Sequence, residues 1–201
     1  MRIIPKMLIA ICPALFAVSA CSSNSTTPEA KSELPTVVVT YSVLGSIVKQ
    51  LVGDLATVNV LIPDGQDPHE FEPSAKDIES LNNANIVVSN GLDFEEGLEE
   101  TLENAKTAGV NVFMAGDYIT VRELSEKDHD HGAFDPHLWL SPAAMLEMLP
   151  ELSEAIGTAI GVDLSVQLET LSAELTALDA EIQEIIGGLK CELVSGRDEM
   201  G

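Results

Sequence analysis

The sequence predicts an α/β domain, in which a parallel sheet carries helices on both faces and is followed by one long helix. Runs of β-branched residues alternate with segments of helical periodicity, and the turns between them are short. Such alternation is typical of parallel sheets. Farther along, leucine and isoleucine recur in alternating four- and three-residue steps from Leu164 to Ile185. This spacing predicts roughly 36 Å of helix with a single apolar stripe.

Four strands are expected in the first part of the chain, and each is a short β-branched or aliphatic run. They span residues 36–41, 57–62, 86–88 and 110–114. Parallel sheets bind their ligands at the carboxyl ends of the strands. The loops after the second and fourth strands are therefore expected on the binding edge.

Helices are expected between the strands and after them. They span residues 43–52, 75–83, 94–106, 142–156 and 163–186, and a further strand is expected at 191–194. Ser74 and Asp77 have the spacing of a capping box, and Ser141 before Pro142 is a typical helix start. Glycines 157 and 187–188 are expected to end the last two helices. We expect the long helix to pack on its own domain, with a dimeric coiled coil as the alternative.

The first 35 residues have the features of an export signal and a tether. Arg2 and Lys6 precede an apolar run that is too short to cross a bilayer comfortably. The run ends in VSAC, which resembles the lipobox of bacterial lipoproteins, where the cysteine, here Cys21, is acylated. A plain secretory signal with unmodified Cys21 is the alternative. We therefore expect residues 1–20 to be a signal peptide and 21–35 a flexible tether. The chain would be exported and anchored by lipid to the outer face of the cytoplasmic membrane, or held in the periplasm.

The charge argues against a nucleic-acid-binding protein, and the cysteine content argues against a disulfide-stabilised protein. The formal net charge is −23, which argues against nucleic acid as a partner. Loss of residues 1–20 would remove two basic groups and no acidic one, so the remaining chain is more acidic still. With Cys12 in the signal and Cys21 acylated, Cys191 has no disulfide partner, and no CxxC pair occurs.

The tripeptide Asp-Pro-His occurs twice and supplies two of the four histidines, His69 and His137. Proline removes a backbone donor and restricts the residue before it. The aspartate two residues before each histidine, Asp67 or Asp135, can accept the second imidazole proton and fix the tautomer that a metal ligand needs. We interpret the pair as a metal site assembled by folding from two loops. Two ordinary loop histidines are the alternative.

Three segments together resemble the metal-binding lipoproteins that serve zinc or manganese ABC importers, the cluster A-I solute-binding proteins. They are DGQDPHEFEPS at 64–74, NGL at 90–92 and FDPHLWLSP at 134–142. The resemblance implies two α/β lobes joined by a long rigid helix, with the metal in the cleft between them. His69 and His137 would be the ligands of the first lobe, and the metal would be transported cargo. The partners would be an ABC permease and its ATPase.

The resemblance also implies a division of the chain. Residues 36–140 would form the first lobe, 141–188 the helical segment and 189–201 the start of a truncated second lobe. That lobe supplies a third ligand, histidine or glutamate, and Arg197 stands at the expected position. Guanidinium has no lone pair to offer, so Asp198 or Glu199 would have to substitute. Two histidines are an incomplete shell for zinc, and we expect micromolar binding or weaker, about −8 kcal/mol.

Other polar residues near the motifs have more than one interpretation. His129 and His131 lie in an acidic loop like the loop thought to gather zinc in zinc-type relatives, and a solvated loop is the alternative. Imidazole favours zinc over manganese. Glu70 is a candidate ligand, and a surface charge or a hydrogen-bonding neighbour of a ligand is the preferred interpretation. The glutamates at 95, 96, 99 and 100 are expected on a solvated helix face.

Two other function classes stay open beside metal capture. One is a surface adhesin or scaffold whose metal site has decayed, which Arg197 favours. The other is a zinc hydrolase with Glu70 or Glu72 as the base, because catalytic zinc keeps an open position for water. The sequence has no HExxH helix, nucleophile elbow or phosphate-cradling loop. A binding protein without enzymatic activity is therefore expected.

Overall fold

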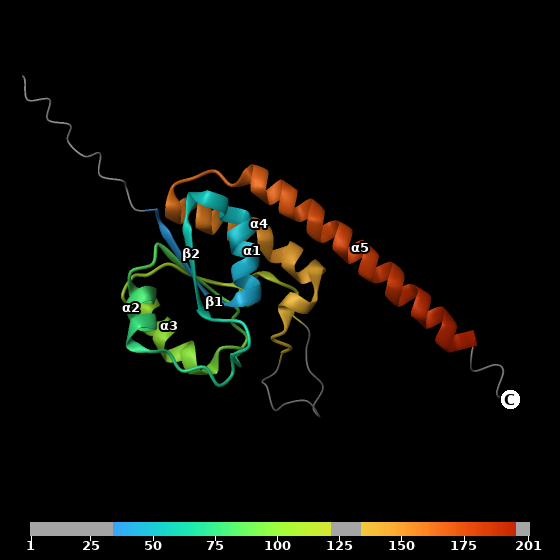
Figure 1. The fold of residues 1–201 in the computed structure, drawn as a ribbon, viewed down its shortest axis with the longest axis horizontal. Helices are drawn as coiled ribbons and strands as arrows, with labels where there is room; N and C mark the ends of the chain where they lie inside the picture. Colours follow the sequence, from blue (N-terminus) through green and yellow to red (C-terminus); the bar gives the residue numbers. More distant parts are fainter. Residues whose placement is uncertain (1–33, 122–133, 196–201) are drawn as a thin grey trace, which may run out of the picture. The chain divides into compact units, whose positions relative to one another are not determined.

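The central element is a parallel four-stranded sheet, as the sequence predicts. The computed structural model describes residues 34–121 and 134–195, with side chains as far as Gly188. The strands are β1 (Thr36–Tyr41), β2 (Thr57–Ile62), β3 (Ile86–Ser89) and β4 (Val112–Met114), in the order β2-β1-β3-β4 (Figure 1). Val38 of β1 is in register with Asn59 on one side and Val87 on the other. β3 is buried throughout, as expected for an inner parallel strand.

The strand order sends the chain in opposite directions from β1 and β3. The connection from β1 leads to one edge of the sheet, whereas those from β2 and β3 lead toward the other. Right-handed crossovers then place α1 (Ser42–Val52) on one face and α2 (Ala75–Asn82) and α3 (Glu99–Thr107) on the other (Figure 1). Helices on both faces are thus confirmed. The divergence leaves a crevice at the carboxyl ends of β1 and β3, where sheets of this class bind ligands.

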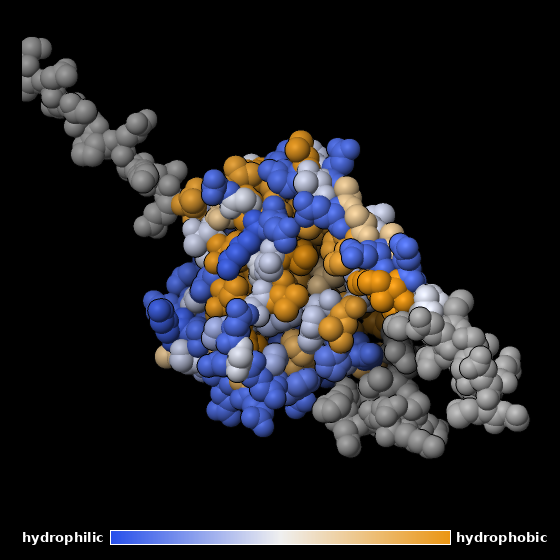
Figure 2. Space-filling view, turned by 45° about the vertical axis from the view of Figure 1, so that its right-hand side comes forward, coloured by the Kyte–Doolittle hydropathy of each residue, from blue (hydrophilic) through white to orange (hydrophobic). Residues whose placement is uncertain are grey.

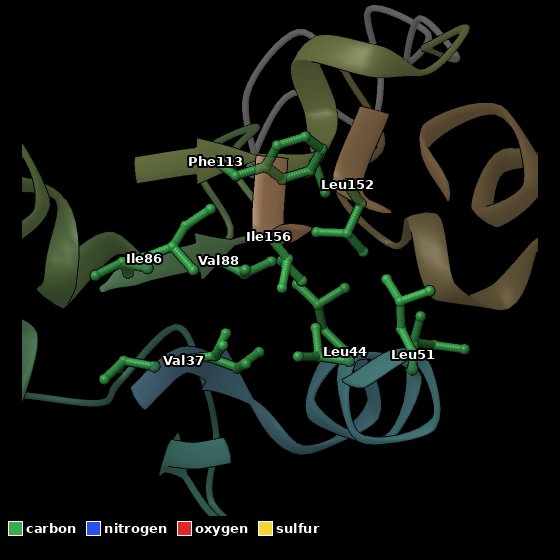
Figure 3. Close-up of a cluster of buried hydrophobic side chains, with 14 of the residues drawn as sticks. Val37, Leu44, Leu51, Ile86, Val88, Phe113, Leu152 and Ile156 are labelled. Carbon is green, nitrogen blue, oxygen red and sulfur yellow. The ribbon is translucent and has the colours of Figure 1, made fainter. Parts of the chain in front are cut away.

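Two helices cover the α1 face and build most of the core. α1 contacts β1 and β2, and α4 (Pro142–Ile160) contributes fully buried side chains to the same core. Figure 3 shows Leu44 and Leu51 of α1 and Leu152 and Ile156 of α4 in one cluster beside the strands of the sheet. All four side chains are fully buried. On the face that Figure 2 shows, hydrophilic residues surround smaller hydrophobic groups, in keeping with the acidic composition.

Helix starts follow their sequence signals closely. Ser74 and Asp77 form the predicted capping box, and the Ser141 hydroxyl accepts from the backbone N–H of Ala144 with Pro142 in the first turn. Short 3-10 helices occupy several connections. They are η1 (Gly53–Leu55), η2 (Glu96–Leu98), η3 (Ala115–Tyr118) and η5 (Leu138–Leu140).

The expected end of α4 at Gly157 is wrong, because the helix continues to Ile160. Gly157 is instead a point of close approach, where a Cβ would lie 2.8 Å from the Val162 carbonyl oxygen. Gly161, with φ of 73°, takes the left-handed conformation that ends the helix. Sequence alone could not choose between the two glycines, since the choice depends on how tightly the next segment folds back.

The last helix, α5 (Ser165–Ser195), is longer than expected. It runs through Gly187 and Gly188, and the strand expected at 191–194 is wrong, because those residues continue the helix. Leu164, Leu171 and Leu175 are buried in the core, and α5 contacts α4 and α1. Beyond Leu175 the apolar stripe opens to solvent, with Leu178 46% and Ile185 57% exposed. Packing on its own domain therefore holds for the first half of α5.

Several expectations fall outside the described residues. These are the signal at 1–20, most of the tether, and the individual residues Cys21, His129, His131, Arg197, Asp198 and Glu199. Within 34–121 and 134–195, no helix combines the length and apolar character needed to cross a membrane.

Candidate metal centre

The structure brings the two motif histidines together at the carboxyl edge of the sheet. His69 lies in the loop after β2, and His137 immediately precedes η5. Their ring centroids are 6.4 Å apart, and both rings line one pocket of about 250 Å³. The His69 side chain is 24% exposed and that of His137 is 40% exposed. Two loops separated by 68 positions in the chain therefore present imidazoles to the same space.

His137 is held by the aspartate of its own motif. Asp135 Oδ1 accepts from the His137 backbone N–H at 3.1 Å and lies 2.8 Å from the ring Nδ1. Because an ionised carboxylate only accepts, this contact favours the neutral tautomer with its proton on Nδ1. The lone pair of Nε2 is then available to a metal, as the sequence interpretation requires.

In the first Asp-Pro-His motif the aspartate also accepts from the backbone N–H of its histidine. Asp67 Oδ1 accepts from the His69 backbone N–H at 3.0 Å. A different carboxylate approaches the ring, because Glu96 Oε1 lies 3.7 Å from His69 Nδ1. Glu96 comes from η2, so His69 is flanked by a charge from another loop.

Glu70 does not enter the pocket. It is exposed and, with Asp67 and Glu72, lines a separate surface hollow. Neither of the carboxylates considered as a hydrolytic base therefore lines the histidine pocket. The exposed position of Glu70 is that of a surface charge.

Three aromatic residues form the wall behind the imidazoles. The Phe94 ring centroid lies 5.2 Å from that of His69 and 6.3 Å from that of His137. Trp139 contacts His137 and Phe94, with centroids 5.3 and 4.6 Å apart. Tyr41, at the end of β1, packs on both Phe94 and Trp139. Edge-to-face contacts of this kind restrict the ring orientations.

Glu95 contradicts the expectation of a solvated helix face. Its side chain is buried, and Oε1 accepts from the Asn90 backbone N–H at 2.8 Å and from the Thr40 hydroxyl at 2.5 Å. Oε2 accepts from the Gly91 backbone N–H at 3.2 Å. Burial raises the pKa of Glu95, and these hydrogen bonds lower it in part. Burial, then the nearby Glu95 carboxyl, raise the pKa of Tyr41.

A left-handed turn explains why the sequence prediction failed at Glu95. Gly91, Leu92 and Asp93 have φ of 74°, 57° and 59°. This reversal after β3 delays the helix, so Phe94 and Glu95 point back toward the sheet. A bulky Leu92 in this conformation is a backbone outlier, and such outliers gather at functional sites. The Asn90-Gly91 pair is a turn signal that could have warned against a helix starting at 94.

The spacing of the rings suits a bound metal after a small adjustment. A zinc ion bonded to one nitrogen of each ring at about 2.0–2.1 Å, with a tetrahedral angle, would hold the centroids roughly 5 Å apart. The observed 6.4 Å is slightly wider. Within the described part of the chain, no cluster of three histidine, cysteine or acidic side chains is placed to hold a metal. Two imidazole nitrogens are thus the donors this region supplies.

Comparison with known proteins identifies a matching family. The family model described as "ZnuA: Zinc-uptake complex component A periplasmic" matches residues 37–201. The chain is 37% identical over 132 residues to the "Iron ABC transporter substrate-binding lipoprotein MtsA" of Streptococcus pyogenes serotype M1. The match covers 63% of this chain and 42% of that protein. It is 32% identical over 194 residues to the "Zinc-binding lipoprotein AdcA" of Streptococcus pneumoniae strain R6. That match covers 92% of this chain and 37% of the relative.

Solved structures agree with the fold. The crystal structure of Zn(II)-bound AdcA from Streptococcus pneumoniae superposes with a TM-score of 0.62 at 28% identity, covering 75% of this chain and 32% of that one. The chain therefore spans well under half the length of these relatives.

Proposed function

The chain belongs to the ZnuA family of zinc-uptake components, and on that premise we propose that it captures a divalent transition metal for an ABC importer. The metal is zinc, with manganese as the alternative. The partners are a membrane permease and its ATPase, not nucleic acid. The chain acts outside the cytoplasm, tethered by lipid on Cys21, and has no enzymatic activity. Two relatives whose names describe substrate-binding or zinc-binding lipoproteins support this proposal.

The observation that carries the proposal is the meeting of His69 and His137 in one pocket. Both come from Asp-Pro-His motifs, and the contact of Asp135 with His137 leaves Nε2 free to bind. A pair of imidazoles favours zinc, whereas manganese prefers carboxylates. Two nitrogen donors make an incomplete zinc shell, so we expect micromolar affinity or weaker for this chain.

The other function classes receive less support. A hydrolase would need a base in the pocket, and Glu70 and Glu72 line a separate hollow. An adhesin with a decayed site would not need the Asp135–His137 contact to be retained.

Calorimetric titration of the purified chain with zinc tests the proposal. We expect one site of micromolar affinity that is lost in His69→Ala and in His137→Ala. The variant Glu70→Gln/Glu72→Gln is the control, because it removes two nearby carboxylates that line a separate hollow and leaves both pocket histidines in place. Unchanged binding after loss of either pocket histidine would contradict the proposal.

A further inference from the structure

The Asn90 side chain joins three segments beside the histidine pocket. It follows β3 and is fully buried. Its Oδ1 accepts from the Tyr41 hydroxyl at 2.9 Å, and its Nδ2 donates to the carbonyl oxygens of Gly91 and Pro136, each at 2.9 Å. One carboxamide therefore ties the end of β1, the turn after β3 and the second motif loop to each other.

The bond to Pro136 acts directly on a candidate ligand. Pro136 immediately precedes His137, so the Pro136 carbonyl and the His137 backbone nitrogen belong to the same peptide group. Asp135 already holds that nitrogen and the ring, so the motif is rigid within itself. Asn90 connects this rigid unit to the sheet across 46 residues of sequence.

Two further residues hold Asn90 in place. Glu95 Oε1 accepts from the Asn90 backbone N–H, and the Tyr41 hydroxyl orients the carboxamide. Tyr41 also packs on Trp139, two residues beyond His137. These contacts leave the amide one orientation in which both of its donors are used.

We propose that Asn90 is a positioning residue that sets the place of His137 relative to His69. This inference rests on the proposed metal-capture function. Only a side chain with one acceptor and two donors satisfies the three buried groups around it. Each carbonyl also accepts from a local backbone N–H, that of Phe94 for Gly91 and that of Leu138 for Pro136. An apolar residue of the same shape would therefore remove only the bond that joins the second motif loop to the end of β3, and the loop would lose its fixed place relative to the sheet.

The test compares Asn90→Leu with Asn59→Leu in the full chain. Asn59 is the matched control, because its amide bonds Ser80 on the surface, away from the pocket. We expect Asn90→Leu to weaken zinc binding by about 10- to 100-fold, the usual effect of losing support for a ligand. Asn59→Leu should leave the affinity unchanged. Tyr41→Phe, which removes one bond to the amide and keeps the ring, should cause a smaller loss and serves if Asn90→Leu does not fold.

A measurement without metal separates this inference from the proposed function. Imidazole nitrogen NMR of the metal-free chain should show His137 in one tautomer, and in Asn90→Leu the His137 signals should broaden or split while those of His69 persist. Unchanged His137 signals and zinc affinity would overturn the inference. Equal disturbance of both histidines would overturn it too, since Asn90 would then act on the fold as a whole. Absence of zinc binding by the unmodified chain would instead count against the proposed function.

Discussion

Asp135 illustrates how one side chain can prepare a ligand. Replacing it by asparagine keeps the size but permits the amide nitrogen to face His137 Nδ1, so the preferred tautomer is lost. We expect Asp135→Asn to weaken zinc binding by about 10- to 100-fold. Glu70→Gln makes the same chemical change on the exposed surface and should have no effect. Calorimetry on both variants checks this, and an equal loss in the two would show that net charge, rather than tautomer control, sets affinity.

Glu95 makes stability depend on pH in a predictable direction. Burial raises its pKa in the folded chain, so the folded state keeps a proton that the unfolded state releases. This contribution is fully present below the ordinary carboxyl range near about 4.3 and is lost as the pH rises through the raised value. As the pH rises above the ordinary carboxyl range, we expect stability to fall more steeply in the unmodified chain than in Glu95→Gln. Urea unfolding at several pH values measures both slopes, and parallel curves would refute the prediction.

Among single residues, the sequence predicts the two histidines and the aspartates beside them, but not the support from Asn90 and Glu95. Asp-Pro-His is a local pattern, and its two copies contain the backbone bond to His69, the bond to His137 and the ring contact of Asp135. The roles of Asn90 and Glu95 arise only when β1, β3 and a distant loop meet. Apart from the turn signal at Asn90-Gly91, no local pattern distinguishes the buried Glu95 from its exposed neighbours Glu96 and Glu99.

Among the elements, η2 has a direct role in placing the first histidine loop. A Cβ at Gly97 would lie 2.1 Å from the Phe71 carbonyl oxygen, two residues after His69. Gly97→Ala should therefore push this loop outward, weakening zinc binding several-fold and costing about 1–3 kcal/mol in unfolding free energy.

Gly187→Ala provides the matched control for that change. Gly187 lies in α5 with nothing within 4 Å of its added Cβ. Alanine there should leave zinc affinity unchanged and stabilise the helix by up to about 1 kcal/mol. Chemical denaturation with zinc titration checks both variants. If Gly97→Ala behaved like Gly187→Ala, the contact with Phe71 would not position the loop.

The sequence predicts the boundaries of an element well where a run of β-branched residues or a helix-capping residue marks them. The β-branched runs located β1 and β2, and serine caps located the starts of α2 and α4. Glycines were poorer guides, because Gly157 and Gly187 lie inside helices while Gly161 ends one. A glycine can mark a helix end, a close contact or neither, and tertiary packing decides among them.

For the whole molecule, zinc binding should appear as added stability. A ligand that binds only the folded chain, at 100 times its dissociation constant, stabilises it by about 2.7 kcal/mol. We expect zinc to raise the thermal midpoint, a chelator to reverse the shift, and His69→Ala/His137→Ala to abolish it. An equal shift in that double variant would place the stabilising ion elsewhere.

The arrangement of the sheet explains why two such distant loops can share a ligand. The chain leaves β1 and β3 in opposite directions, so the carboxyl edge between them is not covered by a crossover helix. The strand order was not predicted, since alternation of strands and helices does not specify which strands are neighbours. It was the parallel arrangement alone that placed both histidines on one edge.

The partial exposure of both imidazoles affects the rate of metal exchange as well as the affinity for the metal. A metal ion reaching these partly exposed rings can exchange its aqua ligands one at a time, without displacement of the described residues around the pocket. Departure follows the same unobstructed route, and weak affinity then corresponds to a brief residence time. For the proposed zinc site this means rapid release of the ion, and stopped-flow transfer of zinc to a coloured chelator would measure that rate.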